Sequence, residues 1–145
     1  NEESMVKQVI KRPKIYFEDT GLACYLSRVT SSETLKASYL KGHMVETFIV
    51  NEIIKSYKNN RKDKETSFYY FRNTKQDEID LIIVNDGKIT LIECKCGEEY
   101  KTSDVSSFEK LSNTKFKKTN NAIICTTKTI YPISSGVYVI PFTSI

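Results

Sequence analysis

The sequence predicts a single domain of the α/β (α+β) class. The chain has 145 residues, which fits one domain large enough to bury a real core. Its hydrophobic patterns follow one another in the order helix, three strands, helix, strand, with room for one more edge strand. Between the second and third strand-like runs lies an Asp-Gly pair, a strong signal for a β-hairpin.

The first residues are polar and stand apart from this pattern. Residues 1–12 are interpreted as a linker or the end of a preceding domain, and residues 13–145 as the single domain. The chain begins with Asn1 rather than Met, so we expect it to be a piece of a longer protein. Its polar and acidic start does not have the pattern of a secretory signal.

The remaining elements are predicted from apolar spacing, capping residues and turn residues. Asp19-Thr20 are expected to cap the first helix, and Ser103 or Asp104 the last one. Residues 30–41 are rich in Ser and Thr and stay ambiguous. The predicted elements are a strand at 13–18, a helix at 21–28, a long helix at 42–57, a charged loop at 59–66, a strand at 67–72, a polar connection at 73–77, a helix at 102–111 and strands at 121–126 and 136–140.

The predicted hairpin fixes which residues face one another across its strands. If Asp86-Gly87 is the two-residue loop, Asn85 pairs with Lys88 and Ile82 faces Leu91. Because the side-chain period of a strand is two, this count can be continued toward the open end of the hairpin. The sequence therefore predicts the register of every charged residue in the two strands.

Two carboxylates oppose each other in that register. Asp80 faces Glu93, and Glu78 faces Lys95, all on one face of the sheet. Opposed Cβ atoms lie roughly 4.5–5.5 Å apart, where like charges are destabilising. We therefore expect either a cation between Asp80 and Glu93 or one protonated carboxyl group. A divalent cation with Lys95 beside it is the favoured interpretation, and a plain cross-strand pair of Glu78 with Lys95 is the alternative.

Glu46 is predicted to point at the core from the apolar face of the long helix. At 100° per residue it shares one stripe with Val50, Ile53 and Tyr57 on that apolar face. A buried carboxylate is costly unless it is paired or binds a metal. Glu46 is therefore interpreted as a third metal ligand, or as a carboxylate satisfied by a Tyr hydroxyl, by backbone N–H groups or by Arg72.

Composition excludes several classes of protein. No apolar run approaches the roughly 20 residues that span a bilayer, so we expect no membrane partner. The net charge of +4 permits nucleic-acid binding without indicating it. The four cysteines follow neither disulfide nor zinc spacing, so reduced thiols in a cytoplasmic protein are expected. The glycine-rich loops of ATP and dinucleotide sites are absent from the sequence.

The acidic residues and the lysine favour metal-assisted hydrolysis of a phosphodiester. Mg²⁺ or Mn²⁺ prefers hard oxygen ligands and keeps several waters, so one to three carboxylates suffice. Lys95 could then orient a water or hold charge on the phosphate. Basic residues within 55–64 and 115–118 are interpreted as a solvated surface and the aromatic run 68–71 as core, with phosphate contact as the alternative.

The motif Asp80…Glu93-Cys94-Lys95 resembles the PD-(D/E)XK nuclease superfamily, in which an acidic residue, a hairpin and Glu-x-Lys follow one another. A helical Glu such as Glu46 occurs upstream in several branches, including archaeal Holliday-junction resolvases. The wider pattern is similar to a domain of unknown function that follows the ATPase module in a family of bacterial and archaeal AAA+ ATPases. It covers about residues 12–112, with the similar segments at 14–22, 42–46, 70–72, 78–80 and 92–95.

This resemblance implies a restriction-endonuclease-like fold, with a mixed sheet and flanking helices. It implies that Asp80, Glu93 and Glu46 bind the metal and take part in catalysis with the catalytic lysine, Lys95. It further implies Mg²⁺ or Mn²⁺ as cofactor, DNA as partner and an ATPase domain upstream in the natural protein. The oligomeric state stays open.

Two alternatives stand beside this nuclease hypothesis. The first is a nuclease-fold module without catalysis, used for nucleic-acid or protein binding or for oligomerisation. The second is a purely structural domain, in which Asp80→Asn would stabilise the fold by relieving repulsion from Glu93. Uptake of a divalent cation separates the nuclease hypothesis from both.

Overall fold

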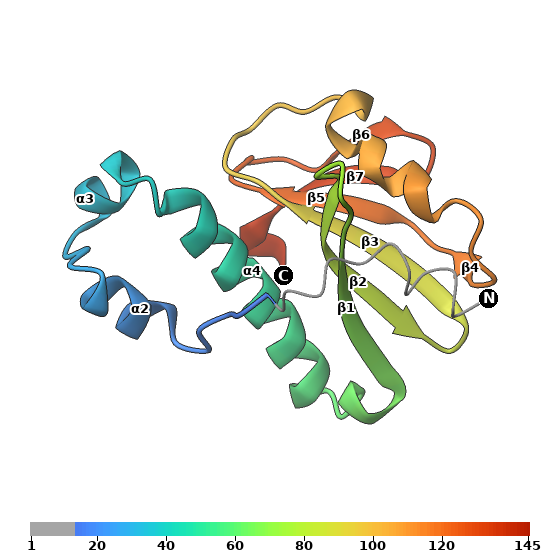
Figure 1. Ribbon diagram of the computed structural model, residues 1–145, viewed down its shortest axis with the longest axis horizontal. Helices are drawn as coiled ribbons and strands as arrows, with labels where there is room; N and C mark the ends of the chain where they lie inside the picture. The colour runs from blue at the N-terminus through green and yellow to red at the C-terminus, as the bar shows by residue number, and fades with distance from the viewer. Residues whose placement is uncertain (1–13) are drawn as a thin grey trace.

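The computed structural model describes residues 14–145, arranged as a twisted mixed sheet with helices on both faces (Figure 1). The segment interpreted as a linker, residues 1–12, lies outside the described residues, as does Pro13. The sheet has seven strands, and six of them follow the spatial order β1-β2-β3-β5-β7-β6. This architecture confirms the predicted α/β (α+β) class.

The strands divide the sheet into an antiparallel and a mainly parallel half. Antiparallel pairing joins the first three strands, β1 (Thr66–Arg72), β2 (Glu78–Asn85) and β3 (Lys88–Cys94). Parallel pairing then joins β3 to β5 (Asn121–Cys125) and β5 to β7 (Val137–Pro141), with β6 (Tyr131–Ser134) antiparallel at the edge. The short β4 (Lys117–Lys118) pairs with the start of β3. The central strand β3 therefore separates the two halves.

The helices occupy both sides of this sheet. The long helix α4 (Lys41–Asn59) covers one face, where Ile49, Val50 and Ile53 pack on Leu81 and Ile92 in a cluster called here the α4-side core. The remaining helical segments are α2 (Thr20–Leu26), α3 (Ser32–Ala37), η1 (Asp63–Glu65), η2 (Thr102–Leu111) and η3 (Phe142–Ser144). No helix within residues 14–145 is long and apolar enough to cross a membrane.

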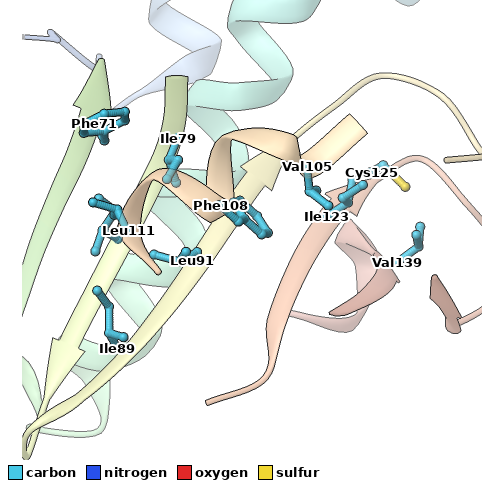
Figure 2. Close-up of a cluster of buried hydrophobic side chains, with 11 residues drawn as sticks. Phe71, Ile79, Ile89, Leu91, Val105, Phe108, Leu111, Ile123, Cys125 and Val139 are labelled. Atoms are coloured by element: carbon cyan, nitrogen blue, oxygen red, sulfur yellow. The ribbon is translucent and has the colours of Figure 1, made fainter. Parts of the chain in front are cut away.

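A second cluster, called here the η2-side core, fills the opposite face. Phe108 and Leu111 of η2 pack over Ile82 and Leu91, as Figure 2 shows for most of the cluster. Because β2 and β3 contribute buried residues to both clusters, these strands are covered on both faces. Their open ends are consequently held in a fixed position, which matters for the charged residues found there.

Most predicted elements appear with small shifts in their bounds. Asp19 caps α2 by accepting a hydrogen bond from the Leu22 amide, as expected. Residues 14–18 are irregular rather than a strand, because they lie beside α4 without a strand partner. The segment 102–111 is a 3₁₀ helix kinked at Val105, and its cap is Lys101 rather than Ser103 or Asp104. The ambiguous stretch 30–41 contains α3, and β4 and β6 were not predicted.

Candidate functional site

The hairpin register is the predicted one near the turn. Asn85 pairs with Lys88, and the recorded pairs continue to Leu81 opposite Ile92. Beyond that pair no ladder contact between β2 and β3 is recorded, and β3 continues beside β5 instead. The Asp80 side chain accepts a hydrogen bond of 2.9 Å from the Cys94 amide. A side chain thus takes the place of a backbone partner where the two strands part.

A β-bulge sets the direction of Asp80. Tyr69 pairs with Ile82 and Phe71 with Ile79, so that Asp80 and Leu81 together oppose the single residue Tyr70. Such an extra residue reverses the alternation of side chains on the strand. Ile79 accordingly lies in the η2-side core and Leu81 in the α4-side core, although an even spacing would give them the same face.

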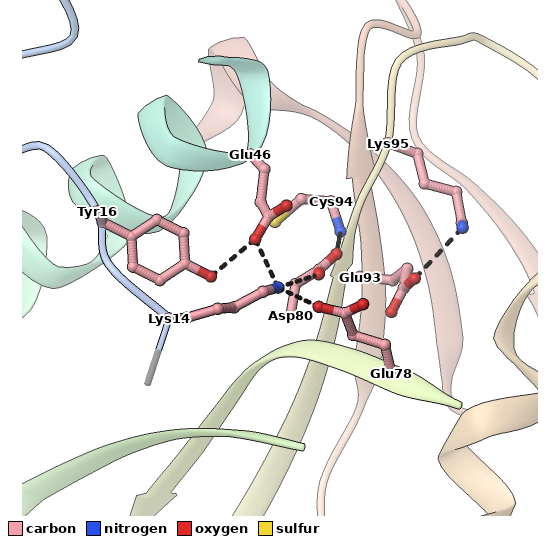
Figure 3. Close-up of polar contacts among 8 residues, drawn as sticks. All are labelled: Lys14, Tyr16, Glu46, Glu78, Asp80, Glu93, Cys94 and Lys95. Carbon is pink, nitrogen blue, oxygen red and sulfur yellow. Dashed lines mark hydrogen bonds and ion pairs between the residues drawn. The ribbon is translucent and has the colours of Figure 1, made fainter. Parts of the chain in front are cut away.

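This bulge corrects the predicted face of Asp80. Strict alternation placed Asp80 and Glu93 on one face, but the reversal turns Asp80 toward α4 and toward Glu46 (Figure 3). Glu93 keeps the alternation of β3, which continues from Ile89 and Leu91 of the η2-side core. The two acids remain neighbours, since the charge of Asp80 acts on the pKa of Glu93. They flank the open end of the hairpin from its two sides.

One lysine joins three of the carboxylates. The Lys14 ammonium lies 2.7 Å from Glu46 Oε1, 2.5 Å from Glu78 Oε1 and 2.8 Å from Asp80 Oδ1 (Figure 3). Burial opposes the charge of Lys14, but the Asp80 charge and the three hydrogen bonds outweigh it and raise the pKa of the ammonium. A cation therefore does sit between acidic side chains, and in this conformation it is Lys14.

Glu46 faces the sheet side of α4, as its stripe predicted. Its carboxylate also accepts a hydrogen bond of 2.7 Å from the Tyr16 hydroxyl. Burial and this bond raise the pKa of Tyr16, so the hydroxyl keeps its proton and donates. The alternative with a Tyr hydroxyl as partner is thus realised, together with a lysine that the sequence reasoning did not assign to it.

Asp80 is the most enclosed of these acids, with 8% of its side chain exposed. Burial raises its pKa, the neighbouring Glu46 raises it further, and Lys14 opposes the shift. Both of its oxygens accept hydrogen bonds, Oδ1 from Lys14 and Oδ2 from the Cys94 amide. The two hydrogen bonds favour the ionised carboxylate, whereas burial and Glu46 favour protonation of the same group.

Glu93 and Lys95 form the second part of the site. The Lys95 ammonium lies 3.3 Å from Glu93 Oε1, while Glu93 Oε2 is buried and has no hydrogen-bond partner. Burial and the charge of Asp80 raise the pKa of Glu93 to about 7, against the pull of Lys95. A protonated carboxyl group, one of the two predicted outcomes, is thus favoured at Glu93 below neutral pH. The alternative pair of Glu78 with Lys95 is not formed, because Glu78 binds Lys14 instead.

The site residues come from three elements and a leading segment. Lys95 donates its amide to the Ile124 carbonyl of β5, which fixes the end of β3. Sequence reasoning missed Lys14 and Tyr16 as participants, although both lie in a segment with the family pattern. The sequence could have indicated them, because carboxylates that point inward need a cation and a hydrogen-bond donor nearby.

The acidic side chains of the site are of the type that binds a metal ion, but their present arrangement is not that of a metal site. Carboxylate oxygens from α4 and β2, with the unpartnered Glu93 Oε2 beside them, are the ligands that Mg²⁺ prefers. Within residues 14–145, however, no three acidic, His or Cys side chains stand in a metal-holding arrangement. The donor set fits the ion, and the Lys14 ammonium is the present partner of its oxygens.

Other candidate features lie away from this site. Hollows of about 280 Å³ beside η2 and about 390 Å³ beside α4 are lined by none of the clustered acids. No disulfide joins the four cysteines, of which Cys125 is buried, Cys24 and Cys94 are half-buried and Cys96 is exposed. The basic residues within 55–64 and 115–118 are exposed and lie around the turn end of the hairpin, at the end of α4 and on β4. Charge is thus divided between the two ends of the hairpin.

Most of the chain matches a known protein family. Residues 41–145 match the family described as Domain of unknown function (DUF4143). The chain belongs to this family. The DUF4143 match begins at the first residue of α4 and includes Glu46, Asp80, Glu93 and Lys95. It also covers the last 30 residues, which the quoted motifs did not reach, whereas Lys14 and Tyr16 precede it. No curated protein and no solved structure matches significantly.

Proposed function

We propose that this DUF4143 domain is a metal-dependent nuclease of the PD-(D/E)XK type that hydrolyses phosphodiester bonds of DNA. The observation that carries the proposal is the convergence of Glu46, Asp80 and Glu93 at the open end of one hairpin, with the Lys95 ammonium 3.3 Å from Glu93. Acids this enclosed are costly to the fold unless they are used to hold a cation.

Each residue has a role that follows from its place. Asp80, Glu93 and Glu46 would hold Mg²⁺ or Mn²⁺, which supplies an activated water and neutralises charge on the phosphate. Lys95, whose backbone N–H donates a hydrogen bond to the Ile124 carbonyl of β5, would donate from its ammonium to the attacking water or to a phosphate oxygen. The unpartnered Glu93 Oε2 is an acceptor available for this chemistry.

The wider setting of the domain is part of the same proposal. The motif resemblance supports an ATPase domain upstream in the natural protein, and the free cysteines support the reducing cytoplasm. DNA as the substrate is supported by the net charge of +4 and by the exposed basic residues at the turn end. A DNA backbone bound to these basic residues would extend along β2 and β3 toward the acidic residues at the open end.

Cleavage of supercoiled plasmid and of branched DNA with excess Mn²⁺ or Mg²⁺ tests the proposal. We expect nicking by the wild type, and a loss of about 100-fold or more in Lys95→Ala and in Asp80→Ala, because both act on charge at the reacting phosphate. Lys36→Ala, which removes an exposed lysine of α3 outside both basic segments, is the matched control and should cleave normally. Cleavage that persists in both site variants contradicts the proposal.

One observation favours a second candidate, a nuclease-fold module that binds without catalysis. The Lys14 ammonium already neutralises three of the acids, so the fold can stand without a metal. Titration calorimetry with Mn²⁺ separates the two candidates. Binding that is lost in Asp80→Ala supports the nuclease, and a folded wild type without any heat of binding supports the binding module.

A further inference from the structure

The segment ahead of α2, residues 14–18, is called here the strap. It has no helix or strand of its own, and it lies beside α4. Its backbone is held by Asn51, whose side-chain amide donates to the Phe17 carbonyl at 2.5 Å and to the Glu18 carbonyl at 3.3 Å. Asn51 is a buried polar residue of α4, so these two hydrogen bonds attach the strap directly to the helix.

The strap alternates between the site and the solvent. Lys14 and Tyr16 point at the acids, while Ile15 and Phe17 are 83% and 53% exposed. Its polar attachment consists of three ion pairs of Lys14 with α4 and β2 and of three hydrogen bonds with side chains of α4. Its apolar attachment is the Tyr16 ring, which is partly buried against the α4-side core. Segments that bury little apolar surface are the ones that open locally at small cost.

The strap and a divalent cation compete for the same atoms. Glu46 Oε1 and Asp80 Oδ1, which would bind the metal, are the atoms that bind the Lys14 ammonium at 2.7 and 2.8 Å. A metal ion that binds oxygen at about 2.0–2.1 Å needs the space in front of the same oxygens. Ammonium and metal cannot occupy it together.

The charges indicate which occupant the acids prefer. Glu46, Glu78 and Asp80 carry three negative charges against the one of Lys14, which leaves a formal charge of −2, with Glu93 beside them. A divalent cation compensates this excess better than one ammonium. The DUF4143 match begins at Lys41, so the acids belong to the matched domain and the competing lysine to the segment before it.

We propose that the strap is an intrinsic inhibitor of the metal site, with Lys14 as a built-in competitor that a divalent cation must displace. This inference rests on the proposed function, because it presupposes a cation at Glu46 and Asp80. Metal binding then releases the first residues of the strap, and any interaction that pulls Lys14 away raises metal affinity. Coupling between two exclusive occupants is reciprocal.

Mn²⁺ titration calorimetry of the whole chain measures this coupling. We expect Lys14→Met to bind Mn²⁺ about 5- to 150-fold more tightly than the wild type, which is the usual range for coupled sites. Asn51→Ala leaves every acid in place and loosens only the strap, so it should tighten binding by a smaller factor. Lys55→Met is the matched control, and Asp80→Ala should abolish binding.

Limited proteolysis gives a second readout on the unmodified protein. Trypsin cleaves after lysine, and the Lys14–Ile15 bond is protected while Lys14 holds its three carboxylates. Saturating Mn²⁺ should increase the rate at which a product beginning at Ile15 appears in mass spectra. This measurement decides the question even if Lys14→Met does not fold.

The outcomes separate the two proposals. Equal Mn²⁺ affinities in the wild type, Lys14→Met and Asn51→Ala, with no effect of Mn²⁺ on cleavage at Lys14, overturn the strap while the metal site stands. Absence of Mn²⁺ binding in every folded variant overturns the proposed function and the strap with it. Tighter binding in either strap variant, or faster cleavage with Mn²⁺, supports the strap.

Discussion

At its turn the β2–β3 hairpin is regular, apolar and surrounded by basic residues, whereas at its open end it is bulged, acidic and held by side chains. Near Asp86-Gly87 each residue has a cross-strand partner, and the faces alternate without interruption. At Asp80 the ladder stops, one extra residue reverses the faces, and a carboxylate caps the Cys94 amide. Both ends contribute buried apolar residues to the core, but the open end also holds enclosed charged groups, which are electrostatically costly.

The largest stability effect is expected in the regular half. Leu91→Ala removes a side chain that is 5% exposed in the η2-side core, and such cavities typically cost about 2–5 kcal/mol. Urea denaturation measures this loss. The exposed Leu26 is the control, since Leu26→Ala should stay within about 0.5 kcal/mol. A loss below 1 kcal/mol in Leu91→Ala contradicts the placement of Leu91 in the packed core.

At the open end, Asp80→Asn should destabilise the fold by about 1–3 kcal/mol. Both Asp80 oxygens accept hydrogen bonds, and an amide can offer only one acceptor, so its NH₂ group would face the Lys14 ammonium or the Cys94 amide. The expected loss is therefore opposite in sign to the gain in stability that Asp80→Asn would give in a purely structural domain, where it would only relieve repulsion from Glu93. The same substitution at the turn, Asp86→Asn, should be nearly neutral, because Asn also tolerates a φ of +47°. Thermal melts without metal compare the two variants. A more stable Asp80→Asn would show that repulsion from Glu93 outweighs the hydrogen bonds of Asp80.

Glu93 should make stability fall as the pH rises. Its pKa is raised from 4.5 to about 7 in the folded protein, so between these values the folded state binds more protons than the unfolded one. Stability is then greatest below pH 4.5, as far as this group is concerned, and is lost as the pH passes 7. Glu93→Gln should remove this loss and be more stable than the wild type at pH 8 by on the order of 1–3 kcal/mol.

Denaturant unfolding at pH 5 and pH 8 measures the Glu93 effect. Glu52→Gln, which alters a more exposed ion pair with Lys55, is the control and should keep the wild-type difference between the two pH values. An unchanged difference in Glu93→Gln would mean that another group carries the pH dependence.

The smallest effect is expected at the turn itself. Gly87 has a φ of +68° and open space where a Cβ would stand, so Gly87→Ala carries only the backbone cost of about 1–2 kcal/mol at most. Gly42 also has open space but sits in α4 without a positive φ, so Gly42→Ala should stabilise by about 0.4–1 kcal/mol. Opposite signs in the two melts are the expected result. A stabilising Gly87→Ala would show that the turn does not need its glycine.

The same contrast explains what the sequence could predict. Pairing near the turn follows from local chemistry, and the Asp19 cap and the Glu46 stripe follow from helix signals, so these predictions agree with the structure. The face of Asp80 depends on how Tyr70 of β1 meets the bulge, which no pattern within β2 reveals. The contact of Lys14 with Asp80 spans 66 residues and joins an irregular segment to a strand. Such a contact follows from three-dimensional packing rather than from any local period.

The bulge also has a consequence for the permanence of the site. It shifts the register of the residues of β2 that precede it by one position relative to the rest of the strand, so that their side chains lie on the opposite faces. Ile79, which is fully buried, lies in the η2-side core only in the shifted register. Restoring the regular register would turn Ile79 toward the charged groups and Asp80 toward the apolar core. The direction of the most enclosed acid is therefore enforced by the hydrophobic effect acting on its neighbour.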